Sequence, residues 1–355
     1  METLDSYKNS RENNFNLLRF IAASMVLVSH SFPLATGSGI SEPLKRFIGI
    51  TFGHIAVDVF FITSGFLITG SLLRSKSYFS YVAARALRIY PALFVAISLI
   101  VFVMGPLVTS LSIGEYFSKE TFVYFAKNVT LFMGVSHTLP GVFENIPWHS
   151  AVNGSLWTLP YELKMYFYLF VVFVLLKESR AYLPDFIKRF YKFEYVIATL
   201  AITSLTLHIA NHFYFHMFND FIRLFSFFFV GSFFYCFAHR IVLNNLLFFV
   251  ATGLLVVSLF SKDAFMLCYI LLLPYLVFYL AYIPRGIIRK FNQLGDYSYG
   301  IYIYSFPIQQ LTAFAIVGIS VLQMTVLAGV ITLCFAIASW HIVEKRSLSF
   351  KPKSS

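Results

Sequence analysis

The sequence predicts an all-α, polytopic membrane protein, a bundle of about ten transmembrane helices. Three observations lead to this fold class. First, 58% of the 355 residues are hydrophobic and 12% are charged, whereas soluble domains carry roughly 25% charged residues. Second, apolar runs of about 20 residues, the length that crosses a bilayer as a helix, recur along the whole chain. Third, basic residues gather in alternate connections between these runs.

Ten apolar runs have the length and composition of a spanning helix. Arg19 interrupts the start of the first run and no small-residue cleavage pattern follows it, so we interpret it as a membrane helix and not a signal peptide. A shorter run, Phe122–Gly134, contains Lys127 and Asn128 and predicts a re-entrant or interfacial helix, with an eleventh span as the alternative. The ten predicted spans are 15–34, 52–73, 86–108, 158–176, 194–210, 219–238, 243–261, 264–283, 296–317 and 322–343.

The distribution of basic residues predicts that both termini are cytoplasmic. Ten spans put the termini on one side, and with that side inside, the inner segments hold nineteen Lys and Arg residues against five outside. We therefore expect one membrane domain over residues 1–355, with a short basic cytoplasmic tail at 344–355. The stretch Trp340–Glu344 before it is expected to be an interfacial anchor.

The formal net charge of +11 is explained by this orientation, so no nucleic acid partner is expected. No metal is expected either. His208, His212 and His216 are spaced by four residues, but they straddle a predicted outer turn and have no carboxylate nearby. Three cysteines lie inside apolar runs without a paired spacing, which predicts buried residues in neither disulfides nor metal sites: Cys236, Cys268 and Cys334.

Ionisable side chains inside spanning helices are the first functional candidates, because each costs about 2.5–3.5 kcal/mol on insertion scales. Arg19 and His30 are eleven residues apart on the first helix, so they share a face and are separated by roughly 16 Å along the axis. A snorkelling arginine and a histidine bonded to backbone are the structural alternative. Asp58 on the second helix needs a partner, and His30 and Arg19 are the expected ones.

Arg85 and Arg88 begin the third predicted helix at the inner membrane boundary, three residues apart on one face. Two guanidinium groups in this position suit a phosphate-bearing ligand from the cytoplasm, although membrane anchoring is the alternative.

Glu162 stands near the outer start of the fourth helix, and Tyr166 lies one turn further on the same face. Its carboxylate is placed to orient or polarise His30, although stabilisation of the helix dipole is the alternative. Ser64 belongs to a Ser-Gly pair of the kind that allows close helix packing. Asp296 is expected to cap the ninth helix.

The chain resembles acyltransferase family 3, bacterial membrane proteins that O-acylate surface polysaccharides and related acceptors. The resemblance covers most of the chain. It rests on the order and spacing of Arg19 and His30, the stretch VDVFFITSGFL at 57–67, the Arg85 and Arg88 pair, the stretch SLWTLPYELKMY at 155–166, and SYGIY at 298–302. The family has a ten-helix core, and some members carry a soluble C-terminal acyl-relay domain, which we do not expect here.

The resemblance implies a cytoplasmic acyl-CoA donor, most often acetyl-CoA, and an acceptor hydroxyl on the outer side of the bacterial inner membrane. It implies a catalytic role for His30, donor binding by Arg85 and Arg88, and a requirement for Arg19 and Glu162. We add Asp58 to the catalytic residues, and Ser64 and Tyr166 to the donor site.

The mechanism that we expect has His30 as general base on an acceptor sugar hydroxyl, which attacks the thioester. Glu162 or Asp58 would orient its ring, and a covalent acyl-His30 intermediate is a variant. A transporter or flippase for a lipid-linked glycan is the alternative function. A structural membrane partner is a third reading, which leaves the two basic pairs unexplained.

Overall fold

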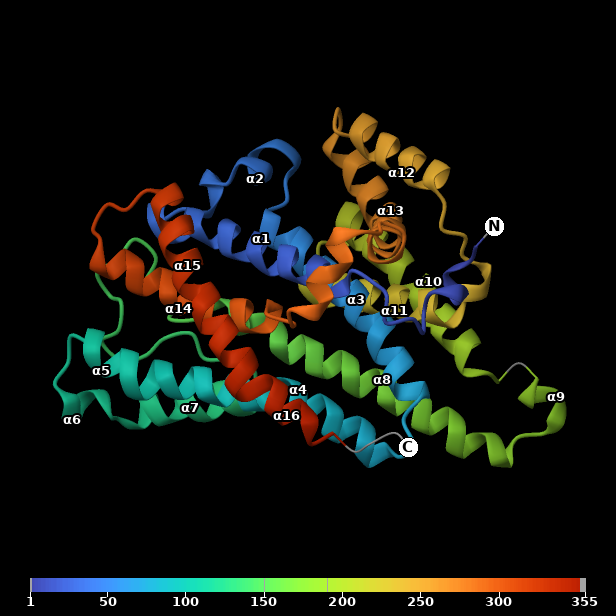
Figure 1. Ribbon diagram of the computed structural model, residues 1–355, viewed down its shortest axis with the longest axis horizontal. Coiled ribbons are helices and arrows are strands. Elements are labelled where there is room, and N and C mark those ends of the chain that lie inside the picture. The colour runs from blue at the N-terminus through green and yellow to red at the C-terminus, as the bar shows by residue number, and fades with distance from the viewer. Residues whose placement is uncertain (1, 150, 190, 352–355) are drawn as a thin grey trace. The chain divides into compact units, whose positions relative to one another are not determined.

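The computed structural model describes residues 2–149, 151–189 and 191–351 (Figure 1). Helices dominate these residues and no strand occurs among them, so the predicted all-α class is confirmed. The α-helices are α1 (Phe15–Thr36), α2 (Pro43–Ile48), α3 (Phe52–Leu73), α4 (Tyr78–Leu99), α5 (Gly105–Val108), α6 (Ile113–Tyr116), α7 (Lys119–Thr130), α8 (Leu159–Ser179), α9 (Asp185–Lys188), α10 (Phe193–Ala210), α11 (Asn219–Cys236), α12 (Asn245–Ser258), α13 (Lys262–Tyr282), α14 (Ser298–Ala315), α15 (Val321–Ser339) and α16 (Lys345–Ser349).

Each of the ten predicted spans falls on a helix. Three described segments are extended by a π-helical turn: η3 (Ile100–Met104) joins α4 to α5, η6 (Asn211–Phe215) prolongs α10, and η9 (Trp340–Glu344) joins α15 to α16. α12 is apolar but has only 14 residues. Within the described part of the chain, seven helical segments are long and apolar enough to cross a membrane: Phe15–Thr36, Phe52–Leu73, Tyr78–Val108, Gly154–Tyr182, Phe193–Phe215, Lys262–Tyr282 and Val321–Ser349. The protein is thus a membrane protein, and a count of ten spans stays a prediction.

The short run after the third span forms α7, which has 12 residues. At 1.5 Å per residue it is about 18 Å long, whereas a hydrocarbon core is about 30 Å thick. This length supports the re-entrant or interfacial helix over the eleventh span.

The chain forms two compact units, each assembled from separate segments. Unit 1 comprises residues 1–18, 57–74 and 161–294, and unit 2 comprises residues 19–56, 75–160 and 295–355. The division runs through α1 and α3, so the two units do not correspond to halves of the sequence.

In unit 1, α10 pairs with α11 and α12 pairs with α13. The part of α3 that belongs to unit 1 packs backbone to backbone against α11. A Cβ atom added at Gly65 would lie 1.9 Å from the carbonyl oxygen of Phe228, and one at Gly231 would lie 2.1 Å from that of Ile62. Only glycine permits this approach at both positions, so α3 is held tightly against α11.

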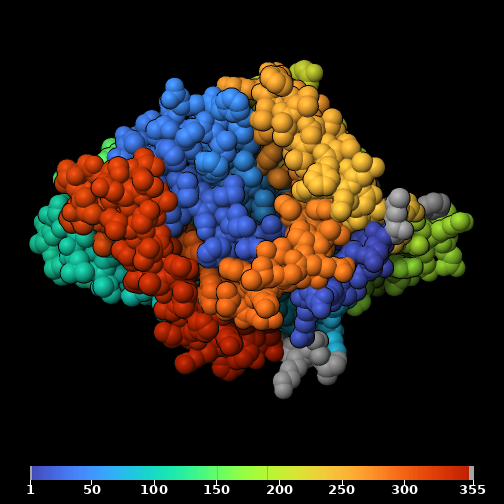
Figure 2. Space-filling view, turned by 45° about the horizontal axis from the view of Figure 1, so that its top comes forward, coloured from blue at the N-terminus to red at the C-terminus, as the bar shows by residue number. Residues whose placement is uncertain are grey.

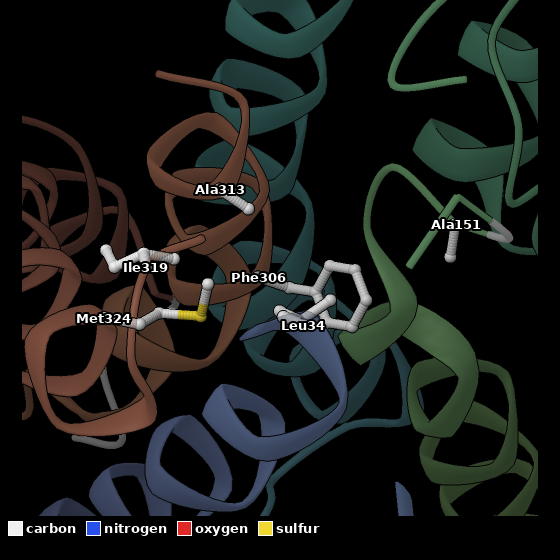
Figure 3. Close-up of a cluster of buried hydrophobic side chains, with 6 residues drawn as sticks. All are labelled: Leu34, Ala151, Phe306, Ala313, Ile319 and Met324. Atoms are coloured by element: carbon white, nitrogen blue, oxygen red, sulfur yellow. The ribbon is translucent and has the colours of Figure 1, made fainter. Parts of the chain in front are cut away.

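In unit 2, α14 and α15 form a helical hairpin, and α4 packs on both α7 and α16 (Figure 1). The end of α1 joins the hairpin through a buried apolar cluster around Phe306, which Figure 3 shows in close-up. Its six buried members are Leu34, Ala151, Phe306, Ala313, Ile319 and Met324.

The long connection before α8 is folded against α14. Gln310 donates to the carbonyl oxygens of Trp148 (2.7 Å) and Ala151 (2.5 Å), and Asn153 donates to that of Ile303 (2.9 Å). These buried amide groups fix the connection next to the helix that also carries Phe306.

Apolar side chains remain exposed along the spanning helices, as a lipid environment requires. α15 and α16, the red segment in Figure 2, run along the surface, and Leu322 and Val330 of α15 are 73% and 62% exposed. The three cysteines are free, as predicted. Their predicted burial is wrong for Cys334, which is exposed on the same helix, and incomplete for Cys236 and Cys268.

Candidate functional site

Unit 2 contains a buried network of charged residues near the middle of α4 and the beginning of α14. Arg85 and Arg88 do not begin their helix as predicted, because α4 starts at Tyr78 behind the Ser77 cap. The guanidinium of Arg88 lies 2.5 Å from a carboxylate oxygen of Asp296 and 3.2 Å from one of Glu344. Arg19 of α1 approaches the same oxygen of Asp296 at 3.8 Å. The side chains of Arg88 and Asp296 are 15% and 14% exposed and that of Glu344 is 2% exposed, so the network is largely removed from solvent.

Local sequence chemistry fixes both carboxylates. Gly295 adopts φ +132°, and a Cβ atom there would lie 2.4 Å from Nε1 of Trp340, so glycine is required where the chain turns into α14. Ser298 donates its hydroxyl and its backbone N–H to Asp296, and Ser339 donates to Glu344 at 3.0 Å.

The two carboxylates differ from their predicted roles. Asp296 does bond the first residue of α14, but Tyr297 occupies the N-cap position, and the ion pairs with Arg88 and Arg19 are its main contacts. Burial of the Asp296 carboxylate is offset by the charges of Arg19 and Arg88 and by the bonds from Ser298. The expectation of an interfacial anchor at Trp340–Glu344 is wrong for Glu344, because this carboxylate is buried against Arg88.

Further cations lie beside this network. The expected basic tail begins as α16, which packs on α4, and residues 352–355 lie outside the described residues. Burial, and then the positive charges of Arg85 and Arg88, lower the pKa of Lys351 to about 8. Lys351 appears in the sequence as one of several tail lysines, and nothing there distinguishes it. Among the described residues, two arginines thus contact the two carboxylates, and Arg85 and Lys351 add two further cations beside Arg88. This local surplus of cations suits an anionic ligand such as a phosphate.

His30 lies eleven residues beyond Arg19 on α1. Its ring packs edge-on against Phe306, with 5.1 Å between the ring centroids. Among the described residues, its buried Nδ1 has no hydrogen-bond partner. The adjacent serines are held firmly: Ser29 donates to Glu42 at 2.8 Å, and Ser31 accepts from Gln309 at 2.8 Å. A histidine so placed is chemically able to accept a proton from a bound hydroxyl.

Asp58 lies in unit 1, where it forms a sealed ion pair. Its side chain is 0% exposed, and it accepts from Arg223 at 2.8 Å and from the hydroxyl of Tyr269 at 2.6 Å. Arg223 also pairs with Asp220 at 3.0 Å. The sequence predicts a cation beside Asp58, and the cation that the structure places there is Arg223, whereas the expected partners were His30 and Arg19. A lone arginine inside an apolar helix needs an anion in the same way.

Three further predicted residues meet in unit 1 between α3 and α8. The hydroxyl of Tyr166 donates to the carboxylate of Glu162 one turn earlier, and the hydroxyl of Ser64 lies 3.1 Å from that of Tyr166. The close packing of Gly65 against α11 fixes Ser64, and the ring of Phe228 packs 6.3 Å from that of Tyr166. The sequence predicted the face shared by Glu162 and Tyr166, but not the contact with Ser64.

A cavity of about 550 Å³ in unit 2, between α4, α14 and α15, does not fit the chemistry. It is lined almost entirely by aliphatic side chains. Of its polar members, Thr312 donates to Ile308 at 2.7 Å and Tyr304 bonds Ser339, so neither is directed at a ligand. In the described residues, no cluster of three His, Cys, Asp or Glu side chains could hold a metal.

The predicted site residues are therefore divided between the units. Unit 2 holds Arg19, His30, Arg85 and Arg88, and unit 1 holds Asp58, Ser64, Glu162 and Tyr166.

Comparison with known proteins gives a consistent result. A profile for an acyltransferase domain matches residues 12–341. The O-acetyl transferase of Shigella phage Sf6 is 32% identical over 356 residues, which covers 96% of this chain and 97% of the phage protein. Nodulation protein 10 of Rhizobium leguminosarum bv. viciae is 32% identical over 169 residues, 46% of this chain and 44% of that protein. No solved structure matches. The profile spans nearly the whole chain, and the protein therefore belongs to acyltransferase family 3 and is a membrane O-acyltransferase.

Proposed function

We propose that the protein transfers an acetyl group from cytoplasmic acetyl-CoA to a hydroxyl group of an extracytoplasmic carbohydrate, such as a surface polysaccharide or a lipid-linked glycan. The observation that carries this proposal is the cation excess around Arg85, Arg88 and Lys351. Arginine and lysine side chains in a partly dehydrated site bind phosphate groups through strong, charge-assisted hydrogen bonds. Coenzyme A carries three phosphates, so it is a suitable ligand for this site.

Arg88 has a double role in this proposal. Its guanidinium joins α4 to Asp296 and Glu344, so it also holds the helices around the donor site in place. Arg85 and Lys351 lie beside Arg88 and add positive charge to the proposed donor site. Arg19, which shares Asp296 with Arg88, links this region to α1.

His30 is the general base in the proposed reaction. It lies on α1 roughly 16 Å along the axis from Arg19, so the phosphates and the thioester of one donor molecule can occupy the two levels. The ring takes the proton of the acceptor hydroxyl as this oxygen attacks the thioester carbonyl, and the CoA thiolate leaves. Base catalysis of this kind contributes about 10²–10⁴-fold to the rate.

The relative from phage Sf6, named as an O-acetyl transferase, supports acetyl as the transferred group. The bias of basic residues supports an inner-membrane location with cytoplasmic termini, which fits a cytoplasmic donor. A flippase for a lipid-linked glycan would need no acetyl donor.

The proposal is tested by comparing surface glycans from a deletion strain with those of its parent by mass spectrometry. Loss of one acetyl group per modified residue is expected, and the wild-type gene should restore it whereas His30→Ala should not. Glycans that are equally acetylated in the deletion strain would refute the proposal. Glycans that are missing from the surface altogether would favour the flippase.

A further inference from the structure

The number of available protons determines which groups donate in the two hydrogen bonds that join Ser64, Tyr166 and Glu162. A tyrosine hydroxyl has one proton, and Tyr166 gives it to the carboxylate of Glu162. The hydrogen bond between Ser64 and Tyr166 must then use the proton of Ser64, with the Tyr166 oxygen as acceptor. The chain therefore runs from the Ser64 hydroxyl through Tyr166 to a carboxylate.

Other hydroxyl groups on α3 behave differently. Thr63 donates to the carbonyl of Val59 at 2.8 Å and Thr69 donates to that of Gly65 at 2.8 Å, the usual local bond of a hydroxyl within a helix. The hydroxyl of Ser64 instead reaches 3.1 Å across to α8. A hydroxyl, an acceptor for its proton and a carboxylate behind that acceptor are the parts of an activated nucleophile.

The surroundings hold this group in place. Gly65 packs against the backbone of α11, Ser232 donates to the carbonyl of Gly65 at 3.2 Å, and Phe228 packs beside Tyr166. Ser64 lies twelve residues from the start and nine from the end of α3, close to the middle of this span. A nucleophile on rigid elements at this depth needs little rearrangement before it reacts.

We infer that Ser64 is a nucleophile that carries the acyl group as an ester between donor and acceptor, activated by Glu162 through Tyr166. This inference rests on the proposed acyl transfer and adds a covalent intermediate to it, so that the acceptor attacks the Ser64 ester in place of the thioester.

The reaction takes place in two balanced steps. In the first, Oγ of Ser64 bonds to the thioester carbonyl carbon, the C–S bond breaks and the CoA thiolate leaves. The serine proton passes through Tyr166 to Glu162. In the second, the acceptor oxygen bonds to the carbonyl carbon, the C–Oγ bond breaks and Glu162 returns the stored proton to Oγ through Tyr166. The proton of the acceptor hydroxyl passes to the base that serves the acceptor and then to water. The CoA thiolate takes up one proton from water, so the two protons balance.

The test is acid quenching of the purified protein after brief exposure to acetyl-CoA without acceptor, followed by peptide mass spectrometry. An acetyl group is expected on the peptide that contains Ser64. It should be absent in Ser64→Ala and slowed at least about 100-fold in Tyr166→Phe and Glu162→Gln. His30→Ala should be labelled like the wild type, because His30 serves the acceptor and no acceptor is present. Ser64→Cys should give a thioester that neutral hydroxylamine cleaves. Thr63→Val, which removes a hydroxyl bonded within α3, is the matched control and should label normally.

The remaining outcomes distinguish failure of the Ser64 intermediate from failure of the proposed function. Transfer to acceptor by Ser64→Ala at the wild-type rate would overturn the inference, as would acetylation of His30 in place of Ser64, and both would leave the proposed function standing. A wild-type protein that neither transfers acetyl nor becomes labelled would overturn the proposed function and this inference with it.

Discussion

Each unit contains a buried ion-pair network, and the two networks differ in charge balance and in exposure. In unit 1, Arg223 is enclosed by two carboxylates and by the hydroxyl that Tyr269 gives to Asp58, whose side chain is 0% exposed. In unit 2, the carboxylates of Asp296 and Glu344 meet two arginines, which retain 15–23% exposure, and Arg85 and Lys351 lie beside Arg88. A network in which the carboxylates outnumber the arginine, and which encloses that arginine, holds helices together. A network with excess positive charge and an opening to solvent is also able to bind an anion.

The largest expected effect is on catalysis in unit 2. His30→Ala should lower acetyl transfer by about 10²–10⁴-fold, because the general base is lost, while the amount of folded protein in membranes stays the same. The measurement is transfer of labelled acetyl from acetyl-CoA to the native glycan. His137, exposed in the connection before α8, provides the control variant His137→Ala, which should keep full activity. Equal activity in both variants would remove His30 from the reaction.

The second largest effect is expected on the stability of unit 1. Asp58→Ala should lower the free energy of unfolding by about 3–5 kcal/mol, because it leaves the buried Arg223 uncompensated. Thermal unfolding in detergent measures this loss. Asp58→Leu combined with Arg223→Met should recover most of it, because replacing both ions removes the desolvation cost. A single variant as stable as the wild type would mean that the pair is not sealed, and a catalytic role for Asp58 would then return.

Glu344→Gln should have two smaller effects: it should lower the stability of the protein and strengthen donor binding. Glu344→Gln should cost about 1–3 kcal/mol of stability, since one charged partner of Arg88 is lost. It should also lower the KM for acetyl-CoA, because the positive charge around Arg88 becomes less neutralised. Steady-state kinetics at saturating acceptor measures the KM. A raised KM would indicate that Glu344 positions Arg88 for the donor and that the charge balance is not decisive.

The smallest effect is expected at Lys351. Its pKa of about 8 means that the amine loses its charge as the pH rises through this value, so the KM for acetyl-CoA should rise between pH 7 and 9. Lys351→Met should raise the KM roughly fivefold at pH 7, corresponding to about 1 kcal/mol, and should flatten this pH profile. Lys353→Met is a control variant on the same tail. A wild-type profile without a rise above pH 8 would exclude Lys351 from the donor site.

The sequence predicted the helical runs well, because lipid imposes a composition that can be read residue by residue. The residues at Arg19, His30, Arg85 and Arg88 stand out because charge is rare in apolar runs. The partners were harder to predict. Glu344 lies 256 positions from Arg88, and Arg223 lies 165 from Asp58, and only tertiary packing brings either pair together. Lys351 resembled any tail lysine, and the bond from Ser64 to Tyr166 depends on how closely Gly65 lets α3 approach α11.

The central claim is that the cation excess of unit 2 binds the phosphates of an acyl-CoA donor. It is tested most directly by equilibrium binding of labelled acetyl-CoA to the purified protein in lipid nanodiscs, over a range of salt concentrations. We predict saturable binding that free CoA displaces, that rising salt weakens, and that Arg85→Met combined with Lys351→Met reduces at least tenfold, which is about 1.4 kcal/mol. Absence of saturable binding, or equal affinity in this double variant, would contradict the claim.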